Sequence, residues 1–173
     1  MSPIVCNIDG RRYYTSTTKF YQTSCKDKSW WINQGYNEQK ANSLTNYAQK
    51  WCNWAIKNNV KHDCVGMSRR AMNDALYGGR EHYKKFGWAC NVGKDFLSKD
   101  RNFKKIPVPP DLKPEDIPKG VIVLYDFGYC YDKNGKALPH GEISDGKGYG
   151  LSDGKFKLLK GGKIKPLEIW IPV

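Results

Sequence analysis

The dipeptide Asn134-Gly135 constrains the fold of this chain more than any other feature. It separates the segment GVIVLYDFGYCYD from the segment ALPHGEIS. Asn-Gly favours the left-handed backbone of a two-residue hairpin turn, and segments rich in Val, Ile, Tyr and Phe favour strands. We therefore expect an antiparallel hairpin here. Further turns at DGKGYG and GG set off LSDGKFKLLK and KIKPLEIWIPV as two more strands, so the C-terminal part predicts an antiparallel sheet of about four strands.

The preceding part of the chain has a helical period instead. NEQKANSLTNYAQKWCNWAIKNN places Leu44, Ala48, Trp51 and Ala55 on one helix face. HDCVGMSRRAMNDALYGG predicts a second helix, with Asp63 as its N-cap and Gly78-Gly79 as its left-handed end. The apolar stripe expected on this helix is Val65, Ser68, Met72, Ala75 and Leu76. Helices followed by an antiparallel sheet indicate the α+β class.

The remaining segments are expected to be less regular. RRYYTSTTKFYQTS favours strand or extended structure, and the adjacent tryptophans of SWWINQGY form either a small apolar cluster or a stacking surface. Residues 80–119 are expected to be irregular apart from a short helix near VGKDFLSKD, with a proline-rich surface loop in IPVPPDLKPEDIPKG. The 173 residues suit a single domain, in which residues 1–35 form an N-terminal extension and residues 36–173 the core.

The chain is strongly basic, with 29 Lys and Arg against 17 Asp and Glu and a formal net charge of +12. Such a charge predicts an acidic partner: nucleic acid, an anionic envelope surface or an acidic wall polymer. No apolar run is long enough for a transmembrane helix. MSPIVCNIDGRRYY lacks the apolar core of a signal peptide. We expect a protein made in the cytoplasm that reaches an outside target only by release or secretion.

The cysteine pattern argues against a metal site. The six cysteines form no C-x-x-C pair, and no histidine stands at zinc-finger spacing; they are Cys6, Cys25, Cys52, Cys64, Cys90 and Cys130. If Cys64 is free, at most two disulfides can form, and their pairing stays open. DKNGKALPHGE begins like a calcium loop, but its acidic residues do not follow the EF-hand spacing. We expect neither a metal nor another cofactor.

Cys64 is placed as a nucleophile would be. It opens the second predicted helix, where backbone N–H groups and the helix dipole stabilise a thiolate. The same N–H groups can bind the oxyanion that forms when a thiolate attacks a carbonyl, so we expect Asp63, Val65 and Ser152 to bind oxyanion or substrate. His62 is too close in sequence to serve as the base, and His82 lies beyond a helix that rises roughly 20 Å. His140 is therefore the expected base.

A catalytic histidine also needs a group that holds its second ring nitrogen. We expect Asp153, because a carboxylate stabilises the imidazolium. Glu142 stays open as a rival, since residues two apart share one face of a strand. Asp145 and Ser152 also stay open, although Asp145 suits a turn.

These residues resemble a known family. CVGMSRRAMNDALYGG is similar to the cysteine-bearing helix of the papain-like NlpC/P60 and CHAP peptidoglycan hydrolases. IPKGVIVLYD resembles the strand that follows in those enzymes, and HGEISDG with GLSDG resembles their histidine-bearing end. The resemblance extends from Asp63 to Gly154. Gly120-Val121 and Gly141 depart from the family pattern, which has Gly-Asp and commonly a branched apolar residue at these places.

The resemblance implies a papain-like α+β fold, with N-terminal helices packed on a C-terminal antiparallel sheet and a cysteine peptidase core over residues 36–173. It also implies a monomeric, bacteriolytic cysteine amidase or endopeptidase that cleaves amide bonds in the stem peptides of bacterial peptidoglycan. Cys64 would attack, and His140 would activate water. The expected source is a phage endolysin. The alternative is a type VI amidase toxin, which would have an immunity or inhibitor protein as a further partner.

Two other functions stay open. One is a papain-like transferase or deamidase with the same chemistry on a protein substrate. The other is a basic, aromatic-rich module that binds nucleic acid or glycan without catalysis. The binding module would account for the charge and for the Tyr and Trp content, but not for a cysteine at a helix start.

Overall fold

The computed structural model describes residues 5–6, 11–16, 19–24 and 27–173. The N-terminal strands pair antiparallel in the order β1-β2-β3. This confirms the strand character expected of residues 11–16 and 19–24. The bounds of these strands are Val5–Cys6, Arg11–Ser16 and Lys19–Ser24 for β1, β2 and β3.

The main sheet has six strands in the order β4-β9-β5-β6-β7-β8, with every neighbouring pair antiparallel. The expected hairpin is confirmed, but its turn is not a two-residue one: Tyr131 pairs with Ala137, and of the Asn-Gly pair only Gly135, with a φ of +78°, is left-handed. The strands are β4 Phe103–Ile106, β5 Ile122–Tyr131, β6 Ala137–Ser144, β7 Tyr149–Leu151, β8 Lys155–Lys157 and β9 Glu168–Pro172.

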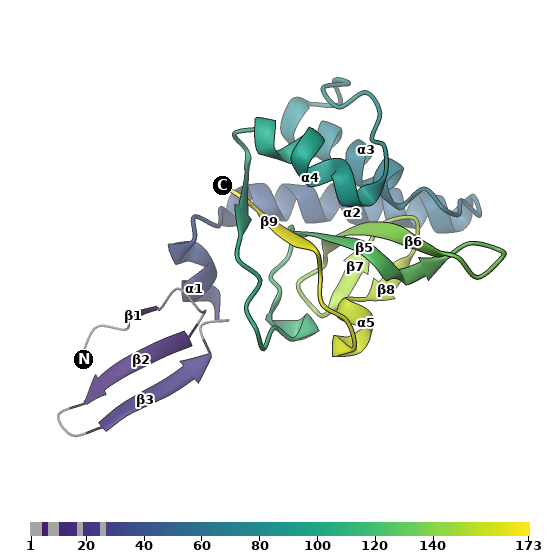
Figure 1. Ribbon diagram of the computed structural model, residues 1–173. Coiled ribbons are helices and arrows are strands. Elements are labelled where there is room, and N and C mark those ends of the chain that lie inside the picture. Colours follow the sequence, from purple (N-terminus) through teal and green to yellow (C-terminus); the bar gives the residue numbers. More distant parts are fainter. Residues whose placement is uncertain (1–4, 7–10, 17–18, 25–26) are drawn as a thin grey trace.

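The helices α1 to α4 precede this sheet in the chain, and α2, α3 and α4 lie together on one side of it (Figure 1). The α+β class is therefore confirmed. None of the helices in the described part of the chain is both long and apolar enough to cross a membrane. The helices are α1 Lys28–Asn33, α2 Glu38–Lys57, α3 Cys64–Tyr77, α4 Val92–Asp95 and the distorted turn α5 Leu159–Gly162; single 3-10 turns cover Ala89–Asn91, Leu97–Lys99 and Pro114–Asp116.

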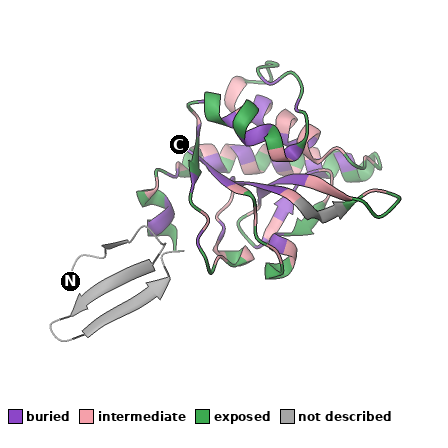
Figure 2. Ribbon diagram, viewed as in Figure 1, coloured by how far each residue is buried: buried purple, intermediate pink, exposed green. Residues whose placement is uncertain are grey.

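Buried residues lie along the strands of the main sheet and on the helices that cover it (Figure 2). Alternation along β5 directs its side chains to the two faces of the sheet. Ile122 and Leu124 pack toward α2 and α3, in a cluster that includes Leu44, Ala48 and Met72. The neighbouring residues Val121, Val123 and Tyr125 belong to a second cluster, which contains Trp30, Trp31, Leu158 and Leu159.

Three expectations about the helices need correction. Trp30 and Trp31 of α1 are buried in the second cluster, so α1 belongs to the core although the sequence placed it in the extension. Trp51, expected on the buried face of α2, is only partly buried, and its indole N–H donates to Asp74 Oδ2 at 2.9 Å. On α3, Ser68 and Met72 are buried as expected, but Met67, Ala71 and Asn73 are buried too and Val65, Ala75 and Leu76 only partly.

The sheet is also larger than expected. Residues 80–119 contain β4, which forms an edge of the sheet beside β9. Its two middle residues are exposed, so FKKI carries no continuous apolar signal. LSDGKFKLLK, expected as one strand, contains the end of β7, a turn, β8 and the start of α5; the turn forms because Ser152 N–H donates to Gly154 O and closes a tight hairpin.

Asp100 is a buried carboxylate at the end of the 3-10 turn before β4. Its oxygens accept hydrogen bonds from Tyr83 Oη, from Tyr77 Oη at 2.7 Å and from Asn102 N at 2.8 Å. Burial alone would raise the pKa of Asp100, but the bonds from Tyr83, Asn102 and Tyr77 outweigh burial and lower that pKa. The ionised carboxylate therefore joins the end of α3 to the start of β4.

We expect Asp100→Asn to lower the free energy of unfolding by about 2 kcal/mol at neutral pH, because an amide accepts fewer of these bonds. A lowered folded-state pKa stabilises the fold fully above the ordinary aspartate value of about 4, and this stabilisation is lost as the pH falls through the folded-state pKa. The difference between wild type and variant in urea titrations should thus shrink below pH 4. A difference independent of pH would contradict this role for the charge.

Candidate active site

Cys64 is the first residue of α3 and is half-buried. The chain turns sharply before it, because His62 has a φ of +60° in the left-handed region. The first N–H groups of any helix have no intrahelical acceptor. The Sγ atom of Cys64 therefore lies at the positive end of a 14-residue helix, as the sequence predicted.

Asp63 occupies the N-cap position, but its side chain accepts no capping hydrogen bond. The expectation of a carboxylate cap is therefore wrong. Instead, the carboxylate lies over Gly66, where a Cβ would stand 2.0 Å from Asp63 Oδ1. The backbone N–H groups of the first turn are therefore not hydrogen-bonded to the Asp63 side chain.

His140 lies on β6 and is 1% exposed. Its Nε2 atom is 3.0 Å from Glu142 Oε2, and the other oxygen of Glu142 accepts a 2.9 Å hydrogen bond from Tyr125 Oη. The hydroxyl of Tyr125 in turn accepts a bond from Leu159 N. Glu142 is fully buried. Three side chains on one face of the β5–β6 pair thus form a connected chain that holds the imidazole.

The structure assigns the carboxylate that holds His140 to Glu142, not to Asp153. Asp153 Oδ2 accepts the backbone N–H of Asp63 at 3.0 Å, and its Oδ1 accepts the Ser152 hydroxyl at 3.3 Å. Asp153 therefore connects the β7–β8 turn to the start of α3. The difference arises because Asp153 lies on a separate hairpin, whereas Glu142 shares a strand face with His140.

Asp145 and Ser152 form their hydrogen bonds away from the imidazole. Asp145 accepts the N–H groups of Lys147 and Tyr149 and pairs with Lys155 at 3.2 Å, as expected of a turn residue. The Ser152 side chain is buried and directed to Asp153 and Gly154. It lies outside the residues that line the cleft described next.

Cys64 and His140 line the same cleft, whose volume is about 920 Å³. Gly141 lets the strand approach the helix, because a Cβ there would lie 3.3 Å from Val65 Cγ1 and 3.1 Å from Leu124 Cδ2. The strand β7 pairs with β6 at Ile143 and Ser144, beyond His140, and the Phe156 ring of the following strand β8 lies against the imidazole. The cleft is also lined by Asp63, Val65 and Asp153, so that five of the six residues expected at the site meet here.

The rim of the cleft is unusually apolar for a surface. Most of the large hydrophobic side chains that the described part of the chain exposes lie here, namely Ile56, Trp88, Tyr131 and Phe156. Trp88 is 62% exposed, and the ring of Phe156 contacts that of His140 edge-on at 5.7 Å. Exposed apolar clusters of this kind mark binding sites. Sequence analysis missed all four residues, since they come from four separate segments and share no pattern.

Gly150 provides the space that Glu142 occupies. A Cβ at Gly150 would stand 2.1 Å from Glu142 Cδ. We expect Gly150→Ala to displace the carboxylate, to lower any hydrolytic rate at least about tenfold and to lower the free energy of unfolding by about 1–3 kcal/mol. Gly87→Ala is a control for stability only, because a Cβ there meets nothing within 4 Å but Gly87 itself lines the cleft. Unchanged rate and stability in Gly150→Ala would refute this packing.

His82, Cys52 and Cys90 do not line the cleft. His82 stacks on Tyr77 at 3.8 Å, at the far end of α3. Cys52 is buried in the core, where burial raises the pKa of its thiol. Cys52, Cys64 and Cys90 are free thiols, whereas Cys25 and the side chains of Cys6 and Cys130 lie outside what the structure describes. Among the described residues, no group of three His, Cys, Asp or Glu is arranged to hold a metal ion.

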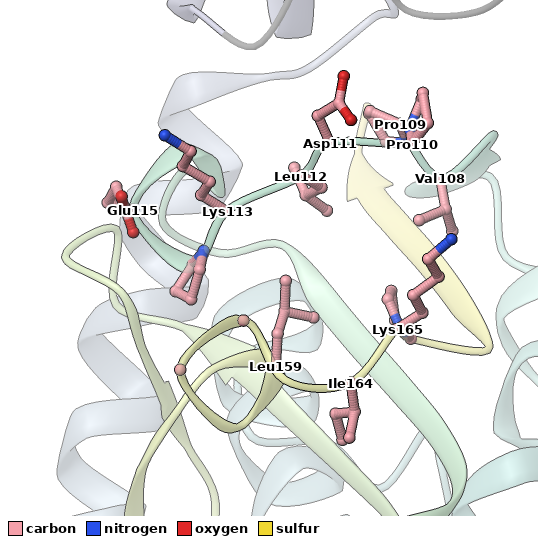
Figure 3. A pocket seen from close by; sticks show the side chains of 14 residues that line it. Val108, Pro109, Pro110, Asp111, Leu112, Lys113, Glu115, Leu159, Ile164 and Lys165 are labelled. Atoms are coloured by element: carbon pink, nitrogen blue, oxygen red, sulfur yellow. The ribbon is translucent and has the colours of Figure 1, made fainter.

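A second cavity, of about 610 Å³, lies where the proline-rich loop meets the segment after β8 (Figure 3). Pro109, Pro110 and Leu112 line it from the loop, and Leu159 and Ile164 from the other side. Among the described residues that line this cavity there is no cysteine or histidine, so the cleft at Cys64 is the better candidate for chemistry.

Comparison with protein-family models, with curated proteins and with solved structures finds no significant match to this chain.

Proposed function

We propose that this protein is a cysteine amidase or endopeptidase that hydrolyses amide bonds in the stem peptides of peptidoglycan. One observation carries the proposal: a cysteine at a helix start and a histidine held by a buried carboxylate line a single cleft. A nucleophile, a base and a group that orients the base are the parts that thiol-dependent acyl transfer needs. With this function we also propose that the helices and the sheet form a papain-like fold.

The reaction would proceed in two halves. His140 takes the proton of the Cys64 thiol, and the sulfur attacks the amide carbon while the N–H groups of the first turn of α3 bind the oxyanion. The C–N bond then breaks, and His140 returns the proton to the leaving amine, which leaves a thioester on Cys64. Water, deprotonated by His140, cleaves the thioester and regenerates the thiol. Glu142 stabilises the imidazolium in both halves.

The choice of peptidoglycan rests on the family resemblance and on charge. A net charge of +12 attracts a protein to anionic polymers and surfaces such as those of bacterial envelopes. The protein would act on the wall, in the periplasm or outside the cell, after release as a phage endolysin. Secretion as a type VI toxin is the second route, with the same chemistry.

The test is digestion of purified sacculi by wild type and by Cys64→Ala, with the released fragments identified by mass spectrometry. Muropeptides released by wild type alone are expected, and their masses identify the bond that is cut. If neither protein releases fragments and Cys64 is alkylated no faster than Cys90, the hydrolase proposal fails.

A binding module is the second candidate, and one cluster favours it. The Arg70 guanidinium carbon lies 5.2 Å from the Trp51 ring and 5.5 Å from the ring of the exposed Trp54. Such a cation–aromatic surface can bind an anionic polymer. Salt-dependent binding of sacculi or nucleic acid, lost in Trp54→Ala and without fragment release by wild type, would support this candidate.

A further inference from the structure

The charges inside the cleft are compensated unequally. Four charged side chains line it: the carboxylates of Asp63 and Asp153 and the ammonium groups of Lys61 and Lys85. Asp153 accepts the Asp63 N–H and the Ser152 hydroxyl. The Asp63 carboxylate lies over Gly66 in the first turn of α3, where the helix dipole favours a negative charge. Asp153 is thus compensated by two hydrogen bonds, whereas the Asp63 carboxylate accepts no capping hydrogen bond and is stabilised by the helix dipole alone.

The two lysines differ in this respect. Lys61 lies in the loop between α2 and α3, and Lys85 in the segment between α3 and the 3-10 turn at Ala89. Both are exposed. Within residues 27–173, no ion pair or side-chain hydrogen bond joins either ammonium group to another residue, whereas Lys28 and Lys155 have carboxylate partners at 2.8 Å and 3.2 Å. Within this part of the chain, the cleft thus presents two cations without counter-ions.

An apolar surface lies beside these cations. Trp88 follows Lys85 by three residues, and Ile56 precedes Lys61 by five, and all four residues line the cleft. A ligand that suits this lining has an apolar or backbone part for the rim and an anionic group for the lysines.

Resting on the proposed function, we propose that Lys61 and Lys85 bind a free carboxylate of the peptide in the cleft, and so select acidic over amidated substrates. The carboxylate can belong to a side chain of the stem peptide or to its C-terminus, since both present the same anion. The lysines act in binding only and take no part in the bond-breaking steps. Exposed ion pairs of this kind are individually weak, so we expect a preference of about tenfold from two together.

The test compares kcat/KM for synthetic stem peptides with free carboxylates and for the same peptides with carboxamides. Wild type is expected to prefer the carboxylate peptides about tenfold, and raising the salt concentration should reduce the preference. The double variant Lys61→Gln/Lys85→Gln should lower the preference to about twofold or less. Peptides amidated at only the side chain or only the C-terminus identify which carboxylate is bound.

The matched control is Lys57→Gln/Lys84→Gln, which removes the same charge from two exposed lysines outside the cleft. This pair should keep the wild-type preference. Equal cleavage of both peptides by wild type, or an equal loss of preference in both double variants, would overturn the inference while leaving the proposed function standing.

Binding measurements keep the two proposals separate. Isothermal titration of Cys64→Ala with the same peptides requires no cleavage. If wild type cleaves neither peptide, the hydrolase proposal fails. Tighter binding of the carboxylate peptide by Cys64→Ala, lost when Lys61→Gln/Lys85→Gln is added but kept when Lys57→Gln/Lys84→Gln is added, would still support the lysine site. Equal binding of both peptides by Cys64→Ala would overturn it.

Discussion

Replacing Cys64 by alanine is expected to lower the cleavage rate of a soluble muropeptide by about 10⁴-fold or more, since the loss of a nucleophile removes the covalent route entirely. Cys64 is the only cysteine among the described residues that line the cleft, and it begins α3 where a thiolate is stabilised. Binding of the muropeptide should persist, because alanine leaves the cleft walls unchanged. The measurements are single-turnover rates and calorimetric affinity for the same substrate.

Cys90 provides the matched control for Cys64. It is a free, half-buried thiol like Cys64, but it does not line the cleft. Cys90→Ala should retain the wild-type rate, and iodoacetamide at neutral pH should modify Cys64 well before Cys90 in the wild type. A Cys64→Ala variant that still cleaves at a rate near wild type would refute the role of this cysteine.

The second large effect is expected at Glu142, which holds His140 by a 3.0 Å contact to Nε2. Glu142→Gln should lower kcat by about 10²- to 10⁴-fold while the fold is kept. A glutamine retains the bond from Tyr125, but its NH₂ group, turned toward the ring, forces Nε2 to accept. The proton then resides on Nδ1, so this nitrogen can no longer take the proton of the Cys64 thiol. Alkylation of Cys64 should slow in the same variant.

Variants of Asp153 distinguish the role of Glu142, which holds His140, from that of a carboxylate with only a structural hydrogen bond. Asp153→Asn keeps an acceptor for the Asp63 N–H and should lower kcat less than about fivefold, since the contact needs no charge. Asp153→Ala removes the acceptor and should have the larger effect of the two. If Asp153→Asn instead lowers kcat as much as Glu142→Gln, Asp153 acts as a charged partner of His140 in the working enzyme.

Much of the fold could be predicted from local patterns. Asn134-Gly135 predicted the β5–β6 hairpin, and the predicted segment ALPHGEIS coincides with β6, Ala137–Ser144. The helix predicted after Asp63 begins at Cys64 and ends at Gly78, whose φ is +60°. These features are predictable because turns and helix ends depend on the backbone preferences of a few adjacent residues.

Several features could not be predicted in this way. β4 is an edge strand with two exposed lysines, so its existence depends on pairing with β9 almost seventy residues later. The burial of Trp30 and Trp31 depends on strands that follow them by about a hundred residues. In each case the stabilising contact is distant in sequence, and local propensity does not report it.

Local sequence patterns were enough to predict the elements that carry the candidate chemistry, a cysteine at a helix start and a histidine on a strand of the following sheet. The carboxylate that holds the histidine depends instead on packing between strands, which local patterns do not report. The sequence spacing from His140 was compatible with both Asp153 and Glu142 as its partner. Glu142 is the partner because strand alternation puts it on the same face as His140, and because Gly150 leaves space for its carboxylate. Hydrogen-bond partners depend on separations of about 3 Å, which packing sets and sequence spacing does not.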